Sequence, residues 1–107
     1  MDENYLKTLR VLEETPSLSQ RMLAQRLKLS LGKANFLLNA LISQGLVKAV
    51  HFKNSANKRS YRYDLTPEGM RRKLELTYRF IQLKSREFEH LQQEIETLKH
   101  EIGGFQP

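Results

Sequence analysis

The stretch from Ser19 to Leu41 reads SQRMLAQRLKLSLGKANFLLNAL and decides the fold. It predicts two short helices, 20–27 and 31 to about 44, joined by a tight turn at 28–30. Ser19 and Ser30 stand directly before these helices, where a hydroxyl can accept a bond from a backbone amide of the first turn. Gly45 follows the second helix as a typical terminating residue. This layout is typical of a helix-turn-helix.

Packing requirements between the two helices agree with that layout. A small residue is needed where two helices cross closely, and Ala24 supplies it. Ala34 and Leu37 would pack the second helix against the first. The glycine common at such a turn is replaced by Lys28, which requires either a left-handed backbone or a slightly different turn. A plain αα-hairpin of a helical bundle remains an alternative.

The predicted apolar sides hold Met22, Leu23, Ala24 and Leu27 in the first helix, and Ala34, Leu37, Leu38, Leu41 and Ile42 in the second.

Shorter elements flank the helix pair. Tyr5, Leu6, Leu9 and Leu12 predict a helix over 4–14 that ends before Pro16. After Gly45 the apolar period changes to two, which predicts strands over 46–52 and 60–65 with a polar, cationic connection at 53–59. We expect the second strand to turn Tyr61, Tyr63 and Leu65 toward the core and Arg62 and Asp64 outward.

A long helix from Glu68 to Ile102 completes the chain, about 50 Å for ~35 residues. Thr66 would cap it, Pro67 suits its first position, and Gly103-Gly104 would end it. Apolar residues recur every seven positions, at Leu74, Ile81, Phe88, Ile95 and Ile102, with Thr77, Lys84, Leu91 and Leu98 at the matching positions of a heptad repeat. This heptad repeat predicts a dimer through Leu74, Ile81, Phe88, Leu91, Ile95, Leu98 and Ile102. Alternatively, Leu74, Tyr78 and Ile81 fold back on the chain's own core.

The fold class predicted is therefore mainly α with a small β-hairpin wing (α+β): a winged helix-turn-helix followed by a long coiled-coil helix. The predicted domains are 1–69, a DNA-binding winged helix-turn-helix, and 70–107, a C-terminal dimerisation helix.

Charge is distributed unevenly along the chain. Residues 1–66 hold eleven Lys or Arg against five Asp or Glu, whereas residues 67–107 hold seven of each, so the net charge of +6 belongs to the first part. Between Glu14 and Asp64 there is no acidic residue. That interval contains nine basic residues: Arg21, Arg26, Lys28, Lys33, Lys48, Lys53, Lys58, Arg59 and Arg62. An acid-free, cationic stretch over a helix-turn-helix favours a polyanion such as double-stranded DNA as partner.

The second helix of the pair would enter the major groove. Asn35 and Asn39 could bond adenine, and Lys33 guanine or a phosphate. Phe36 could touch a thymine methyl or pack beneath the wing. Lys58 and Arg59 would reach the minor groove or its phosphates, while Lys53 reads as a solvated loop residue. The predicted DNA-binding residues are Ser19, Arg21, Ser30, Gly32, Lys33, Asn35, Phe36, Asn39, Lys58, Arg59 and Arg62. A dimer would place two such helices ~34 Å apart on a pseudo-palindromic operator.

The same sequence argues against catalysis, and we expect no enzyme activity, metal or cofactor. Cysteine is absent. His90 and His100 would lie ~15 Å apart along a helix, too far to share a metal, and His51 lies in a strand. No Gly-rich phosphate loop, nucleophile elbow or HExxH motif is present. An acidic N-terminus without a long apolar run predicts neither a secretory signal nor a membrane partner, hence a cytoplasmic protein.

Three segments carry a family resemblance: LAQRLKLSLGKANFLLNALISQGLVK (23–48), the wing, and LTPEGMRRK (65–73). In this order they resemble small bacterial winged-helix regulators of the MarR type, with the closest likeness to the group associated with exopolysaccharide (EPS) gene clusters. The resemblance implies a dimeric, DNA-binding transcriptional regulator acting near surface-polysaccharide biosynthesis genes, without metal or cofactor. Larger MarR proteins dimerise through helices at both ends and often bind phenolic ligands, whereas this chain has a short first helix. Any small-molecule effector is unknown.

A different class of function remains open beside this one. The winged helix could be a protein-interaction module whose basic surface docks an acidic partner, with the coiled coil as scaffold.

Overall fold

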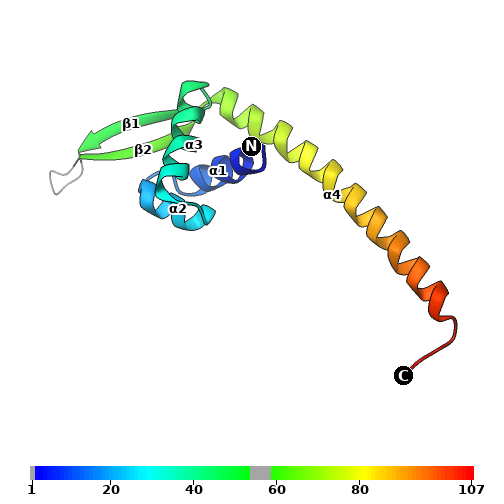
Figure 1. Cartoon of the computed structure of the whole chain (residues 1–107). Helices are drawn as coiled ribbons and strands as arrows, with labels where there is room; N and C mark the ends of the chain where they lie inside the picture. Colours follow the sequence, from blue (N-terminus) through cyan, green and yellow to red (C-terminus); the bar gives the residue numbers. More distant parts are fainter. Residues whose placement is uncertain (1, 54–58) are drawn as a thin grey trace. The chain divides into compact units, whose positions relative to one another are not determined.

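The computed structural model describes residues 2–53 and 59–107. The elements, in chain order, are α1 (Asp2–Glu14), α2 (Gln20–Leu27), α3 (Leu31–Ser43), β1 (Val47–Lys53), β2 (Arg59–Leu65) and α4 (Pro67–Ile102) (Figure 1). The predicted fold class is confirmed: three short helices, a two-stranded antiparallel hairpin and a long C-terminal helix. Because a paired hairpin follows α3, the alternative of a plain αα-hairpin is wrong.

Leucine side chains from the three short helices form the core. Leu9 and Leu12 of α1, Leu23 of α2, and Leu38 and Leu41 of α3 are at most 1% exposed. Leu9 and Leu12, like Leu38 and Leu41, are three positions apart, and in α2 the buried Leu27 follows Leu23 by four, so one face of each helix is apolar and turns inward. The core predicted for the helices is largely confirmed, with one exception in α2 and one in α3. Met22 is 52% exposed and Ile42 is half-buried, because each lies at the margin of its helix's apolar stripe rather than at its centre.

Helices α2 and α3 end in the same way, with a residue in the left-handed region. Lys28 has φ 57° and ψ 43°, and Gly45 has φ 73°. In each case the next residue donates its N–H to a carbonyl five residues back: Leu29 to Ala24 at 3.0 Å, and Leu46 to Leu41 at 2.9 Å. This pairing satisfies carbonyls that a helix end leaves free. Of the two turn geometries open for Lys28, the left-handed one is therefore adopted.

Strands β1 and β2 pair antiparallel with Val47 opposite Leu65 and His51 opposite Tyr61. The base of the hairpin is buried at Val47 and Tyr63, and the backbone N–H of Tyr63 donates to the carbonyl of Pro16 at 2.9 Å. The prediction that Tyr61 faces the core is wrong, since Tyr61 is 51% exposed. The strand alternation is right, but the hairpin extends beyond the helical core, so only the residues at its base find a surface to cover them.

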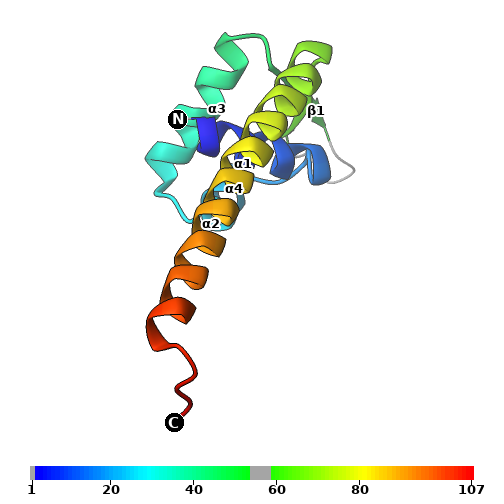
Figure 2. The same ribbon diagram turned by 90° about the vertical axis from the view of Figure 1, so that its right-hand side faces the viewer.

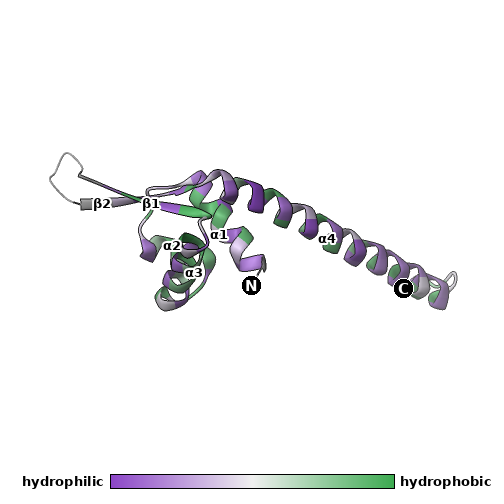
Figure 3. Cartoon of the chain, turned by 90° about the horizontal axis from the view of Figure 1, so that it is seen from above, coloured by the Kyte–Doolittle hydropathy of each residue, from purple (hydrophilic) through white to green (hydrophobic). Residues whose placement is uncertain are grey.

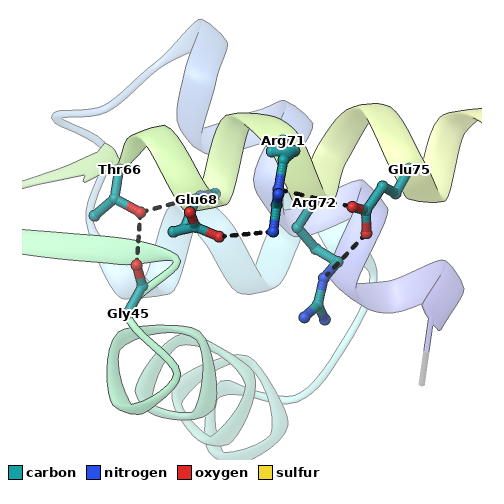
Figure 4. Close-up of polar contacts among 7 residues, drawn as sticks. Gly45, Thr66, Glu68, Arg71, Arg72 and Glu75 are labelled. Atoms are coloured by element: carbon teal, nitrogen blue, oxygen red, sulfur yellow. Dashed lines mark hydrogen bonds and ion pairs between the residues drawn. The ribbon is translucent and has the colours of Figure 1, made fainter.

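Thr66 joins the end of α3 to the start of α4. Its hydroxyl donates to the carbonyl oxygen of Gly45 at 2.6 Å and accepts the backbone N–H of Gly69 at 3.0 Å. The predicted cap is thus confirmed, and it also ties α4 to the turn that precedes β1. Ion pairs Glu68–Arg71 and Arg71–Glu75 follow along the exposed surface of the first turns (Figure 4).

The first turns of α4 pack against the core through Gly69 and Leu76, which is 3% exposed. Lys73 adds an ion pair with Glu13 of α1 at 2.6 Å. Leu74 is 64% exposed, so the alternative that Leu74 folds back on the core is wrong. Leu76 lies two positions further on, on a different side of the helix, and it is Leu76 that packs against the core.

The chain divides into two compact units, Met1–Thr77 and Tyr78–Pro107. Helix α4 is unbroken in both views and contributes to both units (Figures 1 and 2). By its internal contacts the first unit extends to Thr77, so residues 70–77 belong to it. The functional boundary between residues 69 and 70 stays a prediction. Within the second unit every residue from 81 onward is exposed, including the apolar ones.

Candidate nucleic-acid interface

Helix α3 separates its side chains into two sets. Ala34, Leu37, Leu38 and Leu41 are buried. The opposite side carries the predicted base-contacting residues: Gly32, Lys33, Phe36 and Asn39 are exposed and Asn35 is half-buried. The helical period of 3.6 residues produces this separation because the buried residues fall three or four positions apart. The structure therefore brings five predicted DNA-binding residues together on the outer side of one helix.

Phe36 is the most informative member of this exposed face. It is 66% exposed, so it does not pack beneath the wing, and that alternative is wrong. Exposing a phenyl ring to water is unfavourable, and an apolar contact with another molecule would relieve that cost. Contact with a thymine methyl stays a prediction.

Asn35 and Asn39, one helical turn apart, lie close enough to bond to each other. The amide of Asn39 donates to the Oδ1 of Asn35 at 3.5 Å, a long and exposed bond. Such a bond contributes little, because water competes for both amides. Both side chains keep donors and acceptors of the kind that recognise adenine.

Serine hydroxyls cap both helices of the pair. Ser19 accepts the N–H of Met22 at 3.1 Å, and Ser30 accepts the N–H of Lys33 at 3.2 Å. The hydroxyls are therefore engaged within the chain. The backbone N–H groups of the first residues of each helix have no partner within the helix, which is the arrangement that can bind a phosphate.

Where their side chains are described, the basic residues of the acid-free interval are all exposed, and Arg26 and Arg62 are also ion-paired. Arg21, Lys28, Lys33 and Lys48 are exposed. Arg26 pairs with Glu14 at 3.1 Å and also donates to the Thr15 hydroxyl, a structural role that local sequence did not reveal.

Arg62, a predicted DNA contact, is bound to a carboxylate within its own strand. Its Nε lies 3.0 Å from both carboxylate oxygens of Asp64, two positions along β2 on the same side. The spacing in the sequence could have indicated this pair. Arg59 begins β2 opposite Lys53, and its side chain, like the whole of Lys58, lies outside the described residues.

The wing also carries an aromatic cluster that the sequence analysis missed. The His51 and Tyr61 rings stack at a centroid separation of 4.7 Å across the strand pair, and Tyr61 lies 6.1 Å from Tyr63 on the same strand. Residues directly opposite or two apart share one face of a hairpin, so the register would have indicated it. The cluster runs from the buried Tyr63 near the base of the hairpin to the exposed His51–Tyr61 pair further out.

Over residues 2–53 and 59–107 the structure contains no group of three or more His, Asp or Glu arranged to hold a metal ion. In the same parts of the chain, no helix is long and apolar enough to span a membrane.

Comparison with known proteins agrees with this geometry. Residues 1–48 match the family model described as winged helix-turn-helix DNA-binding. No curated protein sequence matches the chain significantly. Among solved structures, the PcaV transcriptional regulator from Streptomyces coelicolor with its natural ligand has a TM-score of 0.68 at 22% identity, covering 95% of this chain and 73% of that one.

Two further solved structures show the same likeness. A MarR family protein from Mycobacterium tuberculosis, in complex with salicylic acid, has a TM-score of 0.65 at 22% identity, covering 94% of this chain and 76% of that one. FabT from Streptococcus pneumoniae, in complex with DNA, has a TM-score of 0.56 at 17% identity, covering 92% and 73%. The chain therefore has the winged helix-turn-helix fold that these three proteins share.

Proposed function

We propose that this protein is a sequence-specific, double-stranded DNA-binding transcriptional regulator of the MarR type that acts as a dimer. Helix α3 enters the major groove, and the 53–60 wing lies on the minor groove or the phosphate backbone. From the sequence resemblance we further propose that it acts in the bacterial cytoplasm on surface or exopolysaccharide genes.

One observation carries the proposal: α3 is buried on one side and presents amide, cationic and aromatic groups on the other. Lys33, Phe36 and Asn39 are all exposed there, and no acidic residue lies between Glu14 and Asp64 to repel phosphate. In a helix-turn-helix the exposed side of the second helix is the part that meets base edges. The structural likeness to FabT, which was solved in complex with DNA, supports DNA as the partner.

The dimer is supported by the exposed apolar stripe of α4. Phe88, Leu91 and Ile95 are between 44% and 61% exposed in the single chain. Apolar side chains at heptad spacing are normally buried against a second helix. A two-fold dimer would bind two half-sites about one helical turn, ~34 Å, apart.

The test is fluorescence anisotropy with a duplex from the gene's own upstream region, measured at several salt concentrations. The affinity should fall steeply with salt, with each phosphate contact contributing roughly −0.9 to the log–log slope. Lys33→Ala should reduce the slope by about one unit if Lys33 binds phosphate. Arg86→Ala removes the same charge from the exposed surface of α4 and should leave the slope unchanged.

Sequence recognition is tested separately with single base-pair variants of the duplex. Asn35→Ala should lose about 1–3 kcal/mol of discrimination at one base pair, whereas Lys33→Ala, if it contacts phosphate, should weaken all duplexes similarly. Gln93→Ala, an amide removed from α4, is the matched control. Tight binding that none of the α3 substitutions affects would show that α3 does not contact bases. Absence of binding to any duplex at low salt would favour an acidic protein partner instead.

A further inference from the structure

The apolar residues of the second unit form one continuous stripe. Hydrophobic residues recur along α4 between hydrophilic ones (Figure 3). From Phe88 to Ile102 the spacing alternates between three and four residues, which keeps them on one side of the helix. All are exposed in the single chain: Phe88 61%, Leu91 54%, Ile95 44%, Leu98 59% and Ile102 56%. This stripe, defined by these five residues, is called the seam below.

We propose that the seam pairs with the same residues of a second copy as a parallel, in-register, two-stranded coiled coil. This inference rests on the dimeric regulator proposed above and adds the orientation and number of its helices.

The residue types of the seam favour two strands. In the heptad numbering, Ile95 and Ile102 occupy a positions, and Leu91 and Leu98 occupy d positions. In a parallel dimer the a side chains lie beside each other in a geometry that suits a β-branched residue, whereas the d geometry suits leucine. Isoleucine at both positions, or leucine at a with isoleucine at d, would instead favour three or four strands.

Charges beside the seam favour the parallel orientation. The g positions hold Glu87, Glu94 and Glu101. In an antiparallel pair, g positions of one helix face g positions of the other. When the two seams overlap fully, Glu94 faces Glu94 of the second copy and Glu87 faces Glu101 of the second copy. In a parallel pair each g position faces the e position of the next heptad. Glu94 then lies opposite Lys99 of the second copy, twice by symmetry.

Neither Glu94 nor Lys99 makes a strong contact within its own chain. Glu94 meets His90 at 3.3 Å and Lys99 meets Glu96 at 4.0 Å within the same helix, and all these side chains are more than half exposed. Such exposed pairs within a helix contribute little, so both groups can turn toward a second chain. Antiparallel pairing therefore sets only like charges together, and parallel pairing sets opposite charges together.

The seam begins after Lys84, which occupies a d position. Its ammonium lies 3.4 Å from the Glu87 carboxylate and 5.5 Å from the centroid of the Phe80 ring, both of them contacts of an exposed side chain within its own helix. Two lysines facing each other at one d layer would repel, which limits the tight part of the pair to Phe88 onward.

Orientation decides where the two DNA-binding units are joined. In the parallel pair both chains enter the seam from the same end. In an antiparallel pair centred on the seam, the two Tyr78 positions would be separated by roughly 45 Å along the axis, from 1.5 Å per residue. Only the parallel pair holds both units at one end of the seam.

Cysteine crosslinking tests the orientation, because the natural sequence contains no cysteine. Gln106→Cys places a thiol beyond the C-terminal end of the seam. In a glutathione redox buffer a parallel dimer should become covalent in most of the molecules. Ser17→Cys, an exposed position in the first unit, controls for random collision and should crosslink little.

A charge exchange tests the same proposal without cysteine. Lys99→Glu sets like charges opposite each other in a parallel pair, so the dimer dissociation constant from sedimentation equilibrium should rise roughly 3- to 10-fold. The double variant Glu94→Lys/Lys99→Glu restores opposite charges and should recover the original value. In an antiparallel pair Lys99 faces the neutral Ser85, and Lys99→Glu should have no such effect.

The parallel orientation would be overturned by a dimer that does not crosslink at position 106 and whose dissociation constant is unchanged by Lys99→Glu. A monomer, or a trimeric or tetrameric mass, would overturn the two-stranded seam. DNA binding by the same preparations separates the two proposals. Binding without crosslinking refutes only the orientation, whereas crosslinking without binding to any duplex refutes only the regulatory function.

Discussion

Gly69 of α4 lies directly against the backbone of Leu46, which follows α3, and we expect Gly69→Ala to destabilise the fold. A Cβ built at Gly69 would press on the carbonyl oxygen of Leu46 and lie 3.0 Å from its carbonyl carbon. This obstacle is backbone and cannot rotate away. The same Leu46 carbonyl accepts the N–H of Thr66 at 3.1 Å, and the Leu46 N–H donates to Leu41. Relieving the clash would therefore disturb both the end of α3 and the start of α4.

The size of the effect follows from two opposing contributions. Inserting an extra carbon into a closely packed site typically costs about 1–3 kcal/mol. Alanine is more favourable than glycine within a helix by up to about 1 kcal/mol, which offsets part of that cost. We expect a net loss of about 1–2 kcal/mol in the free energy of unfolding. For a domain of this size that corresponds to a midpoint lower by roughly 5–15 °C.

Urea unfolding followed by circular dichroism measures the change, at one fixed protein concentration because dimerisation would add to the apparent stability. Gly32→Ala is the matched control. No atom lies within 4 Å of its built Cβ, so only the helix preference remains, and stability should rise by up to about 1 kcal/mol.

Opposite signs for these two glycine substitutions would confirm the close approach at Leu46. If Gly69→Ala proves as stable as the natural protein, or gains as much as Gly32→Ala, the clash with the Leu46 carbonyl is not a real constraint.

Three further predictions follow from other contacts. Lys28→Gly should raise stability by about 1 kcal/mol, because the left-handed backbone at Lys28 is costly for a residue with a Cβ; thermal unfolding measures this, and an equal gain in Lys28→Ala would contradict the reason. Thr66→Val should lower stability by about 1–2 kcal/mol through loss of both hydroxyl bonds, while Thr66→Ser should retain most of it in the same urea assay. Gly32→Ala should weaken duplex binding in anisotropy while stabilising the free protein, if its backbone approaches DNA; unchanged binding would show that it does not.

Much of the fold could be predicted because local patterns specify it. Ser19, Ser30 and Thr66 cap helices as their positions indicate, and Gly45 ends α3. Hydrogen bonds of this kind involve residues three to five apart, so the spacing in the sequence is sufficient to find them. The exposed side of α3 follows for the same reason, because the buried residues recur at the helical period.

Other features depended on surfaces that are distant in the sequence. Alternation placed Tyr61 and Tyr63 on one face of the wing, but only the extent of the hairpin beyond the helices decided that Tyr61 stays exposed. Heptad spacing selected Leu74, whereas Leu76 is the residue that the core covers.

The sequence by itself determined, to within two residues, where the helices begin and end, which face of each is apolar, and that the excess positive charge belongs to the first 66 residues. Only the tertiary structure decided which of those faces are covered, that Gly69 meets the Leu46 backbone, and that Arg26 is held by Glu14. The physical reason is the distance along the sequence over which each interaction acts. Caps and periodicity act within a turn of the chain, whereas burial and ion pairing depend on which distant segments the fold brings together.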